Sequence, residues 1–370
     1  MIGKRISQLP TPALLIDQDT VVHNLTKVSD MVRSAGKKLR PHIKTHKIPA
    51  FAKMQIDSGA VGICTAKVSE AEVMAEAGIK DILVANEIVG ADKLIRLAKL
   101  AKQAKISVLA DSIQTADWLG ETARDYDVIF HVLVEVDTGD ARCGALPEFV
   151  PQIAKRISQW PNLHFAGLET FGGAVFHCQG KEEELRRAEA LGITMKKVKS
   201  DVEAAGLTVE EVSVGGSPAI SLLVKEPLYT ELRPGAYIFN DAATVCRGAA
   251  TYEECAATVL TTVISRPTGN RMVVDGGAKT FSYCRPGVVF GCRILHGVVK
   301  GNPSVCLSNL SEEHGVFETE EGLPDYCVGE KIQVLPAHIC PVINLFNQAY
   351  LIKDGIVQDV VSIAARGMSE

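Results

Sequence analysis

The sequence predicts an α/β protein that combines a (β/α)8 barrel of the TIM type with a C-terminal all-β domain. Eight short apolar segments alternate with amphipathic helical segments over the first two thirds of the chain, which is the pattern of parallel βα units. After about residue 246 the helical period is lost, and short β-rich runs separated by turn signals follow. Eight βα units within roughly 230 residues favour a closed barrel.

The barrel strands follow a short opening strand, residues 11–16, and an amphipathic helix that ends near Gly36. The eight barrel strands are expected at residues 39–43, 61–64, 81–84, 106–109, 130–136, 165–168, 211–214 and 232–239. Pro234 and Gly235 interrupt the last of them.

The helices between these strands are read from apolar residues at helical spacing. The helix after the second strand opens with the capping-box spacing of Ser69 and Glu72 and ends at Gly78. A long charged helix is expected at about residues 182–204. An open, doubly wound sheet is the alternative architecture. The GxGxxG turn that favours dinucleotide binding is, however, missing after the first strand.

The second domain is inferred from β-rich runs that turn signals such as Asp354-Gly355 separate. These runs are residues 257–265, 271–274, 288–294, 331–335, 348–353 and 356–363. We therefore expect the barrel over residues 10–245 and the β domain over residues 246–370, with residues 1–9 able to join the latter.

The composition of the 370-residue chain narrows the class of protein. Hydrophobic residues make up 46% and the net charge is −5, so a large core is expected and neither nucleic acid nor membrane binding is indicated. No apolar segment follows the N-terminal residues, which argues against a signal peptide. The ten cysteines form no CxxC pair. Reduced thiols and a cytoplasmic location are expected.

A reactive lysine is expected where the first barrel strand ends. In the segment RPHIKTHK, histidines and cations crowd Lys44 at the end of an apolar run. Catalytic groups of such barrels lie at the C-terminal ends of the strands. The alternative is a solvated surface lysine. His42 and His46 could stack on or hydrogen-bond a cofactor ring, or could be packed loop histidines.

A phosphate site is expected after the seventh and eighth strands. Gly215, Gly216 and Ser217 form a glycine-rich turn whose backbone N–H groups and hydroxyl can bind an anion, and Tyr237 lies at the next turn. A plain tight turn is the alternative. A phosphate-bearing cofactor beside a lysine amine suggests pyridoxal 5'-phosphate (PLP), which Lys44 would hold as a Schiff base.

Two further side chains are expected at the same end of the barrel. Arg142 follows the fifth strand and could donate to the phenolate oxygen of the cofactor, or could instead pair with Asp137 or Asp140. His177 follows the sixth strand and could be a general base, because the unperturbed pKa of histidine is near neutrality. A lone loop histidine is more often structural.

A divalent metal site is suggested by His338 and Cys340 in the segment PAHICP. An HxC pair in an extended segment places both side chains on one side of a strand. Imidazole and thiolate suit Zn²⁺, with Mn²⁺ or Mg²⁺ as alternatives, and water and substrate would complete the site. Glu313 and His314 could support it. The alternative is a buried cysteine beside an ordinary histidine.

Taken together, these motifs resemble the D-threonine aldolase / D-serine dehydratase family, whose members are fold-type III PLP enzymes with an alanine-racemase-like barrel. The segments that carry the resemblance are RPHIKTHK, VEVDTGDARCG, VGGSPA, YTELRPGAYIFND, EEHG and PAHICP…IAARG. They occur in the expected order and span nearly the whole chain.

The resemblance implies that Lys44 carries PLP, that Arg142 lies near its ring, and that His338 and Cys340 bind a divalent metal near the substrate's 3-hydroxyl group. It places Gly215, Gly216, Ser217 and Tyr237 near the phosphate. Family members act on small-molecule D-amino acids bearing a 3-hydroxyl group, commonly as homodimers.

The resemblance leaves two reactions open. Dehydratases of the family resemble this chain in having His-x-Cys, whereas the aldolases usually have His-x-Asp, so Cys340 favours a dehydratase of the D-serine or D-3-hydroxyaspartate type. His177 matches the proposed base of the aldolases and favours cleavage to glycine and an aldehyde. The segment Thr170-Phe171-Gly172-Gly173 stands where many relatives carry Tyr and His, and Pro218 replaces a usual Gly. An amino-acid racemase and a non-catalytic PLP-binding protein are less favoured.

Overall fold

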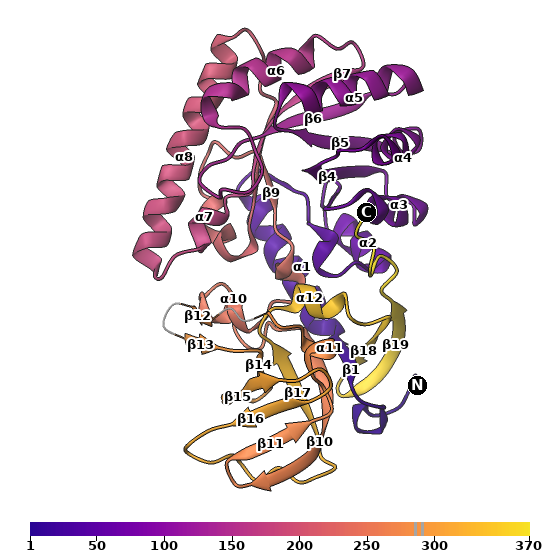
Figure 1. Ribbon diagram of the computed structural model, residues 1–370, viewed down its shortest axis with the longest axis vertical. Helices are drawn as coiled ribbons and strands as arrows, with labels where there is room; N and C mark the ends of the chain where they lie inside the picture. Colours follow the sequence, from indigo (N-terminus) through magenta and orange to yellow (C-terminus); the bar gives the residue numbers. More distant parts are fainter. Residues whose placement is uncertain (285–286, 290–291) are drawn as a thin grey trace. The chain divides into compact units, whose positions relative to one another are not determined.

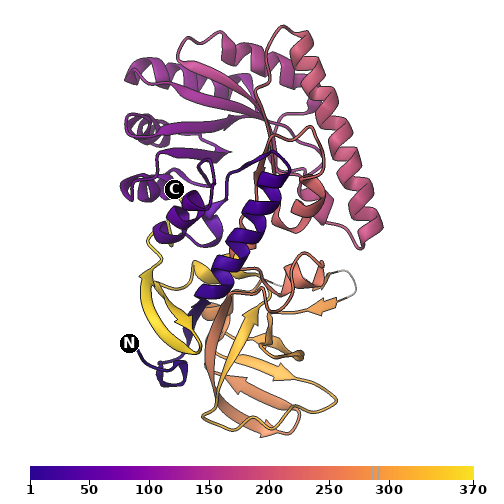
Figure 2. The ribbon, with the colours of Figure 1, turned by 180° about the vertical axis from the view of Figure 1, so that it is seen from behind.

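The computed structural model describes residues 1–284, 287–289 and 292–370. The chain forms two compact units, which Figures 1 and 2 show from opposite sides. The first, called the β unit below, comprises residues 1–27, 45–48 and 236–367. The second, called the barrel unit, comprises residues 28–44, 49–235 and 368–370.

The barrel unit contains eight parallel strands, as the sequence predicted. Their order around the sheet is β2-β9-β8-β7-β6-β5-β4-β3, and a bridge between His42 and Cys64 links β2 to β3. The eight strands therefore form a closed ring, not an open sheet. The strands are β2 (Lys38–Leu39), β3 (Ile63–Thr65), β4 (Asp81–Glu87), β5 (Lys105–Ala110), β6 (Phe130–Glu135), β7 (Leu163–Thr170), β8 (Glu211–Gly215) and β9 (Glu231–Arg233).

Helices lie on the outside of these strands (Figures 1 and 2). They are α2 (Pro49–Asp57), α3 (Val68–Glu76), α4 (Ala91–Ala101), α5 (Ile113–Tyr126), α6 (Val150–Ser158), α7 (Gly173–Phe176), α8 (Lys181–Ala204) and α9 (Ile220–Leu223). Helix α8 confirms the long helix expected before the seventh strand. The capping box expected at Ser69 was wrong, because α3 begins at Val68. The Glu70 carboxylate instead accepts a hydrogen bond from the N–H of Ala66 at 2.7 Å.

The first and last barrel strands are shorter than predicted. Residues Ile43–Thr45 form a 3-10 turn after β2, and residues Ala236–Ile238 form another after β9. Pro234 has no N–H group to continue the ladder, so the strand expected to reach residue 239 ends at Arg233. Both turns follow the C-terminal ends of their strands, where the expected site residues lie.

The β unit is built on a nine-stranded sheet with the order β11-β16-β15-β14-β17-β10-β1-β18-β19. An additional pairing between β10 and β11 closes six of these strands into a ring. The strands are β1 (Ala13–Asp17), β10 (Ala257–Thr268), β11 (Arg271–Val274), β14 (Gly297–Val299), β15 (Asn302–Leu310), β16 (Gly315–Glu318), β17 (Lys331–Pro336), β18 (Gln348–Lys353) and β19 (Ile356–Ser362).

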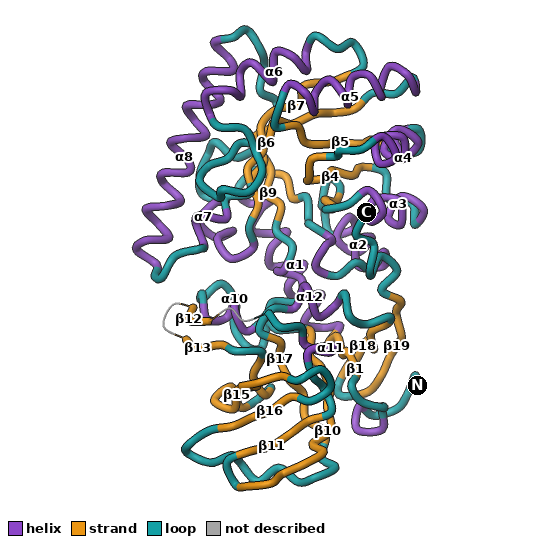
Figure 3. Tube along the Cα trace, viewed as in Figure 1, coloured by secondary structure: helices purple, strands orange, loops and turns teal. Residues whose placement is uncertain are grey.

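Three short helices interrupt this β unit (Figure 3). They are α10 (Ala242–Cys246), α11 (Ala278–Phe281) and α12 (Ile339–Ile343). A separate pair, β12 (Gly287–Val289) and β13 (Cys292–Ile294), lies in the region expected as one strand at 288–294. Residues 290 and 291 of that prediction lie outside the described residues.

The two units differ from the expected boundaries at residues 10–27, 45–48 and 236–245, which belong to the β unit, and at residues 368–370, which belong to the barrel unit. Strand β1 pairs antiparallel with β10 and parallel with β18, so the opening strand completes the C-terminal sheet. Helix α1 (Gln18–Ser34) then continues from the β unit into the barrel unit.

Within the described part of the chain, no helix is both long and apolar enough to span a membrane. Among the described residues, free thiols include those of Cys64, Cys143, Cys178, Cys255, Cys284, Cys327 and Cys340.

Candidate active site

Lys44 lies in the 3-10 turn after β2, at the C-terminal end of the barrel strands, and is partly buried. Its backbone N–H donates to Nδ1 of the buried His42 at 3.3 Å, which orients the turn. Its Nζ atom lies 5.6 Å from the centroid of the Phe171 ring. Lys44 is therefore not a freely solvated surface lysine, because an aromatic side chain from the segment after β7 covers it.

Arg142 approaches the same ring. Its Cζ atom lies 4.5 Å from the Phe171 centroid, within the range of a cation–π interaction. Its Nη2 atom lies 3.2 Å from Oε1 of Glu135, at the end of β6. The alternative partners considered from the sequence were wrong, because Asp137 accepts backbone N–H groups of its own loop and Asp140 accepts from Gly173. No local pattern in the sequence indicated Glu135 as the partner.

His177 lies further along the same segment. It is exposed and ends the short helix α7, and its ring meets Phe176 edge-on at 5.2 Å. Phe176 in turn meets Phe171 edge-on at 5.5 Å. Three aromatic rings in contact thus lead from Lys44 to His177, all on the loop between β7 and α8.

The glycine-rich turn after β8 has the geometry of a backbone cradle. Gly216 has φ +102°, and a Cβ atom there would meet the Phe176 ring at 2.7 Å, so a side chain is excluded. The Ser217 hydroxyl accepts a hydrogen bond from the N–H of Gly235 at 2.8 Å. The turns after β8 and β9 are therefore joined, as a shared phosphate site requires. Tyr237 follows on the second turn and is buried within the β unit.

A buried ion pair at this end of the barrel was missed from the sequence. Arg233 of β9 pairs with Glu169 of β7, and both side chains are 3% exposed. Arg233 also donates to Oγ of Ser213 at 2.6 Å and to the carbonyl of Thr170 at 3.2 Å. Burial lowers the pKa of Arg233 to about 10. A lone arginine in the segment LRPG offered no signal for this role.

Several buried polar atoms near the C-terminal ends of the strands have no hydrogen-bond partner among the described residues. These atoms include Thr65 Oγ1, Asp140 Oδ1 and Glu169 Oε2. Glu87, at the end of β4, is close to Glu135, and burial together with that second carboxylate raises the pKa of Glu87 to about 8. Unsatisfied atoms and shifted carboxyl groups of this kind are typical of functional sites.

The expected metal pair lies in the β unit, but not on a strand. Strand β17 ends at Pro336, His338 is the N-cap residue of α12, and Cys340 is the second residue of that helix. The argument from strand alternation was therefore wrong. Both residues instead lie at the start of α12, and their side chains interact there.

The environment of this pair was also missed from the sequence. The half-buried His338 ring places Nδ1 3.0 Å from Oδ2 of the buried Asp241, and the Cys340 Sγ atom lies 3.2 Å from the Thr45 hydroxyl. Burial opposes charge on His338, but Cys340 and Asp241 raise its pKa to about 11. Although burial raises the pKa of Cys340, His338 outweighs it and the net shift is downward. A lowered pKa favours the thiolate, the form that binds metals.

Among the described residues, no three His, Cys, Asp or Glu side chains are arranged to hold a metal ion. Glu313 pairs with Lys279 at 2.8 Å, and the exposed His314 lies 3.4 Å from the Ser311 hydroxyl. The His338–Cys340 pair would thus need water or substrate to complete a coordination shell.

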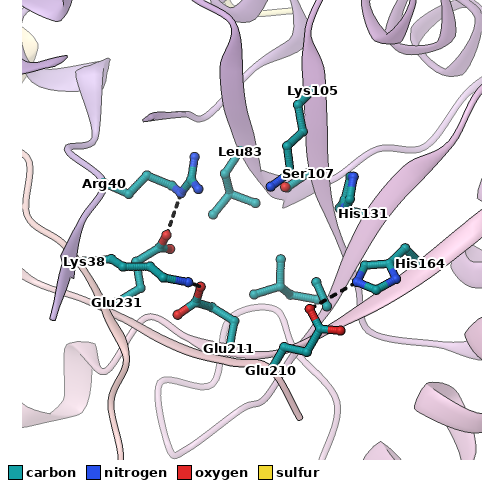
Figure 4. A pocket seen from close by; sticks show the side chains of 12 residues that line it. Lys38, Arg40, Leu83, Lys105, Ser107, His131, His164, Glu210, Glu211 and Glu231 are labelled. Atoms are coloured by element: carbon teal, nitrogen blue, oxygen red, sulfur yellow. Dashed lines mark hydrogen bonds and ion pairs between the residues drawn. The ribbon is translucent and has the colours of Figure 1, made fainter. Parts of the chain in front are cut away.

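A cavity of about 160 Å³ lies at the opposite, N-terminal end of the barrel strands (Figure 4). Its charged groups are already paired. Arg40 pairs with Glu231 at 2.7 Å and with Asp81 at 2.5 Å, and Lys38 pairs with Glu211 at 2.6 Å. Groups at this end of such barrels serve stability, so we do not assign the cavity to catalysis.

Comparison with known proteins agrees with this arrangement. Residues 16–243 match the N-terminal domain of alanine racemase, and residues 256–352 match a serine dehydratase domain. The chain is 32% identical to a D-threonine aldolase of an Arthrobacter species, over 99% of this chain and 95% of that protein. It superimposes on the crystal structure of D-threonine aldolase from Filomicrobium marinum with a TM-score of 0.91 and 33% identity, over 100% and 99% of the two chains.

A dehydratase is similarly close in fold. The structure of D-threo-3-hydroxyaspartate dehydratase from Delftia sp. HT23 matches with a TM-score of 0.89 and 26% identity, over 97% and 99% of the two chains. Two variants of that dehydratase carry alanine in place of a histidine and of the cysteine two residues after it, and the second is in a metal-free form. From its two domains and its site, the chain belongs to the family of PLP-dependent lyases of D-amino acids that includes D-threonine aldolase and D-serine dehydratase.

Proposed function

We propose that this protein is a PLP- and divalent-metal-dependent dehydratase of 3-hydroxy-D-amino acids, of the D-serine or D-3-hydroxyaspartate type. The observation that carries the choice of reaction is the His338–Cys340 pair at the start of α12, with the Cys340 Sγ atom beside the Thr45 hydroxyl. The reaction would remove water across the Cα–Cβ bond and release a 2-oxo acid and ammonia.

The residues at the C-terminal end of the barrel fit PLP. Lys44 provides the amine, and Arg142 contacts the same Phe171 ring as Lys44. Gly215, Gly216 and Ser217 present backbone N–H groups and a hydroxyl at a turn whose close approach excludes a side chain. When bound, PLP supplies an electron sink for a carbanion at Cα. His42 orients the turn that carries the amine.

Lys44 would act on the α-proton of the substrate. An amine held at a strand end and covered by an aromatic ring is positioned and partly shielded from water. An amine held in this position could take the α-proton of the substrate. Removal of the α-proton is common to dehydration and racemisation, so Lys44 does not by itself select the reaction.

The metal donors favour Zn²⁺. A thiolate and an imidazole are soft and borderline ligands, whereas Mg²⁺ and Mn²⁺ prefer oxygen. A metal with open positions polarises a bound hydroxyl group and makes it a better leaving group. Cys340 lies beside the hydroxyl of Thr45, the residue that follows Lys44 in the chain. The same spacing of histidine and cysteine, with a metal-free cysteine variant, occurs in the related D-threo-3-hydroxyaspartate dehydratase.

Retro-aldol cleavage to glycine and an aldehyde is the second candidate. His177 is exposed at the end of α7, where its imidazole is accessible to take the proton of a substrate 3-hydroxyl group. The aldolase relatives also have the higher identities, 32% and 33%. If His177 removes the proton of the 3-hydroxyl group, the Cα–Cβ bond breaks and the oxygen stays in the aldehyde, so the hydroxyl group is not expelled.

Product analysis separates the two reactions. The PLP- and Zn²⁺-loaded enzyme is incubated with D-threonine and, separately, with D-serine. We expect 2-oxobutyrate and pyruvate with stoichiometric ammonia. Glycine and acetaldehyde from D-threonine would overturn the dehydratase proposal. His177→Asn sharpens the assay, because it should leave dehydration within a few-fold of wild type and should abolish cleavage if the aldolase reaction occurs.

We further propose a homodimer acting in the cytoplasm. Seven cysteines, among them Cys64, Cys143 and Cys340, are free thiols, which suits a reducing compartment. Sedimentation of the purified protein tests the oligomeric state.

A further inference from the structure

We infer that Asp241 is a positioning residue for the metal site: its carboxylate holds the Nδ1–H of His338 and so presents Nε2 to the metal. The inference rests on the metal role proposed for His338. Sequence inspection did not single out Asp241, which lies 97 residues before His338 in the chain.

The carboxylate is committed to this contact by its burial and its second bond. Asp241 is 1% exposed. Its Oδ2 atom lies 3.0 Å from His338 Nδ1 and accepts the N–H of Ile339 at 3.1 Å. A buried carboxylate needs such donors, because burial without them is strongly unfavourable. One oxygen therefore holds both the ring and the backbone immediately before Cys340.

The other oxygen fixes the direction of the carboxylate. Oδ1 of Asp241 accepts the N–H of Thr244 at 2.9 Å, and the Asp241 N–H donates to the Thr244 hydroxyl at 2.8 Å. These two bonds form the capping box of α10. Rotation of the carboxylate away from His338 would break the cap, so α10 acts as the rigid support for the ring of His338.

The chemical consequence concerns which ring nitrogen is available. With Nδ1–H held by Asp241, Nε2 is the ring nitrogen left to bind a metal, which would displace the proton from it. A carboxylate behind a metal-bound histidine fixes the ring orientation and increases its basicity, and removing one typically weakens metal binding by 10–100-fold. Cys340, the other proposed ligand, also has a polar neighbour, because its Sγ atom lies 3.2 Å from the Thr45 hydroxyl. Both members of the pair therefore have a polar support.

A purely structural role would make Asp241 only the cap of α10. Asp241→Ser separates the two roles, because serine caps helices about as well as aspartate but its hydroxyl is too short to span both Thr244 and His338. Thr244→Ala is the matched control. It removes the hydroxyl that accepts from the Asp241 N–H, and leaves the carboxylate and its contact with His338 in place.

The test measures Zn²⁺ affinity of the PLP-loaded enzyme by competition with a chromophoric chelator. We expect Asp241→Ser to weaken Zn²⁺ binding 10–100-fold, with Thr244→Ala within about threefold of wild type. Equal weakening by both variants, or wild-type affinity in Asp241→Ser, would overturn the inference. The isosteric Asp241→Asn replaces Asp241→Ser if the serine variant does not fold, and the same outcomes apply.

His338→Ala keeps this result distinct from the proposed function. If His338→Ala binds Zn²⁺ as tightly as wild type, the proposed metal site is wrong and the role of Asp241 falls with it. If His338→Ala binds weakly while Asp241→Ser binds like wild type, the metal site stands and only the role of Asp241 is wrong.

Discussion

The Nζ atom of Lys44 lies 5.6 Å from the centroid of the Phe171 ring. Arg142 contacts the same ring at 4.5 Å, so one aromatic side chain serves two cations that the sequence places about 100 residues apart. Phe171 therefore contacts both the lysine expected to carry PLP and the arginine expected near the cofactor ring.

Replacing Phe171 by leucine should weaken PLP binding. Leucine keeps apolar volume but has no π face, and each exposed cation–π contact contributes about 0.5–1 kcal/mol, or roughly two- to fivefold per contact. Equilibrium dialysis of PLP against wild type and Phe171→Leu measures the change. Val175→Ala, in the same segment but buried, is the control for general loosening of the loop. Unchanged PLP affinity in Phe171→Leu would show that the ring only fills space.

Lys44→Ala should abolish covalent attachment of PLP. Borohydride treatment followed by peptide mass spectrometry locates the modified lysine. We expect the label on the peptide containing Lys44 in wild type and on no peptide in the variant. Lys53→Ala, at an exposed position of α2, should retain the label on Lys44. A label on any other lysine of the wild-type protein would contradict the assignment.

Removing the metal should abolish dehydration, and changing one ligand should change the preferred metal. Treatment with a chelator is expected to reduce activity at least about tenfold, with recovery on adding Zn²⁺, because a metal held by His338 and Cys340 would activate the leaving hydroxyl group. Cys340→Asp should bind Zn²⁺ more weakly and respond better to Mn²⁺, since carboxylates suit harder cations. Metal analysis and activity with each cation test this. Full activity after chelation would exclude a catalytic role for His338 and Cys340.

Glu87→Gln should flatten the pH dependence of stability. Burial and Glu135 raise the pKa of Glu87 from 4.5 to about 8, so the folded protein holds a proton there that the unfolded chain loses. This contribution to stability is fully present below pH 4.5 and is lost as the pH rises to about 8. Thermal unfolding of both proteins across that range measures it. Glu76→Gln, at an exposed position of α3, should keep the wild-type profile.

Arg233→Leu should strongly destabilise the barrel. It leaves the Glu169 carboxylate buried without its cation and removes donors to Ser213 and Thr170. Removing one partner of a buried pair typically reduces the free energy of unfolding by about 3–5 kcal/mol. Denaturant unfolding measures the change. The double variant Arg233→Leu/Glu169→Leu should regain much of the lost free energy of unfolding. If it stays as unstable as Arg233→Leu, the destabilisation comes from the lost hydrogen bonds to Ser213 and Thr170.

The eight barrel strands, the closed barrel and the lysine at the end of the first strand were predicted from the sequence alone, whereas strands β14, β15 and β16 and helices α10, α11 and α12 were not. These features depend on local patterns. Apolar alternation, helical spacing and a motif of eight residues around Lys44 are all visible without knowing which segments pair. The position of a residue at the end of a parallel strand is enough to place it at one end of a barrel.

Only the tertiary structure decided which side chains support these groups, because the partners are distant in sequence and no local pattern relates them. Strand β1 joins β10 and β18, so the chain's first strand belongs to the C-terminal sheet. Asp241 meets His338 across 97 residues at the start of a helix where a strand was expected. The buried carboxylate of Asp241 needs hydrogen-bond donors, because burial without them is strongly unfavourable. The donors that the fold brings to Asp241 therefore determine its role.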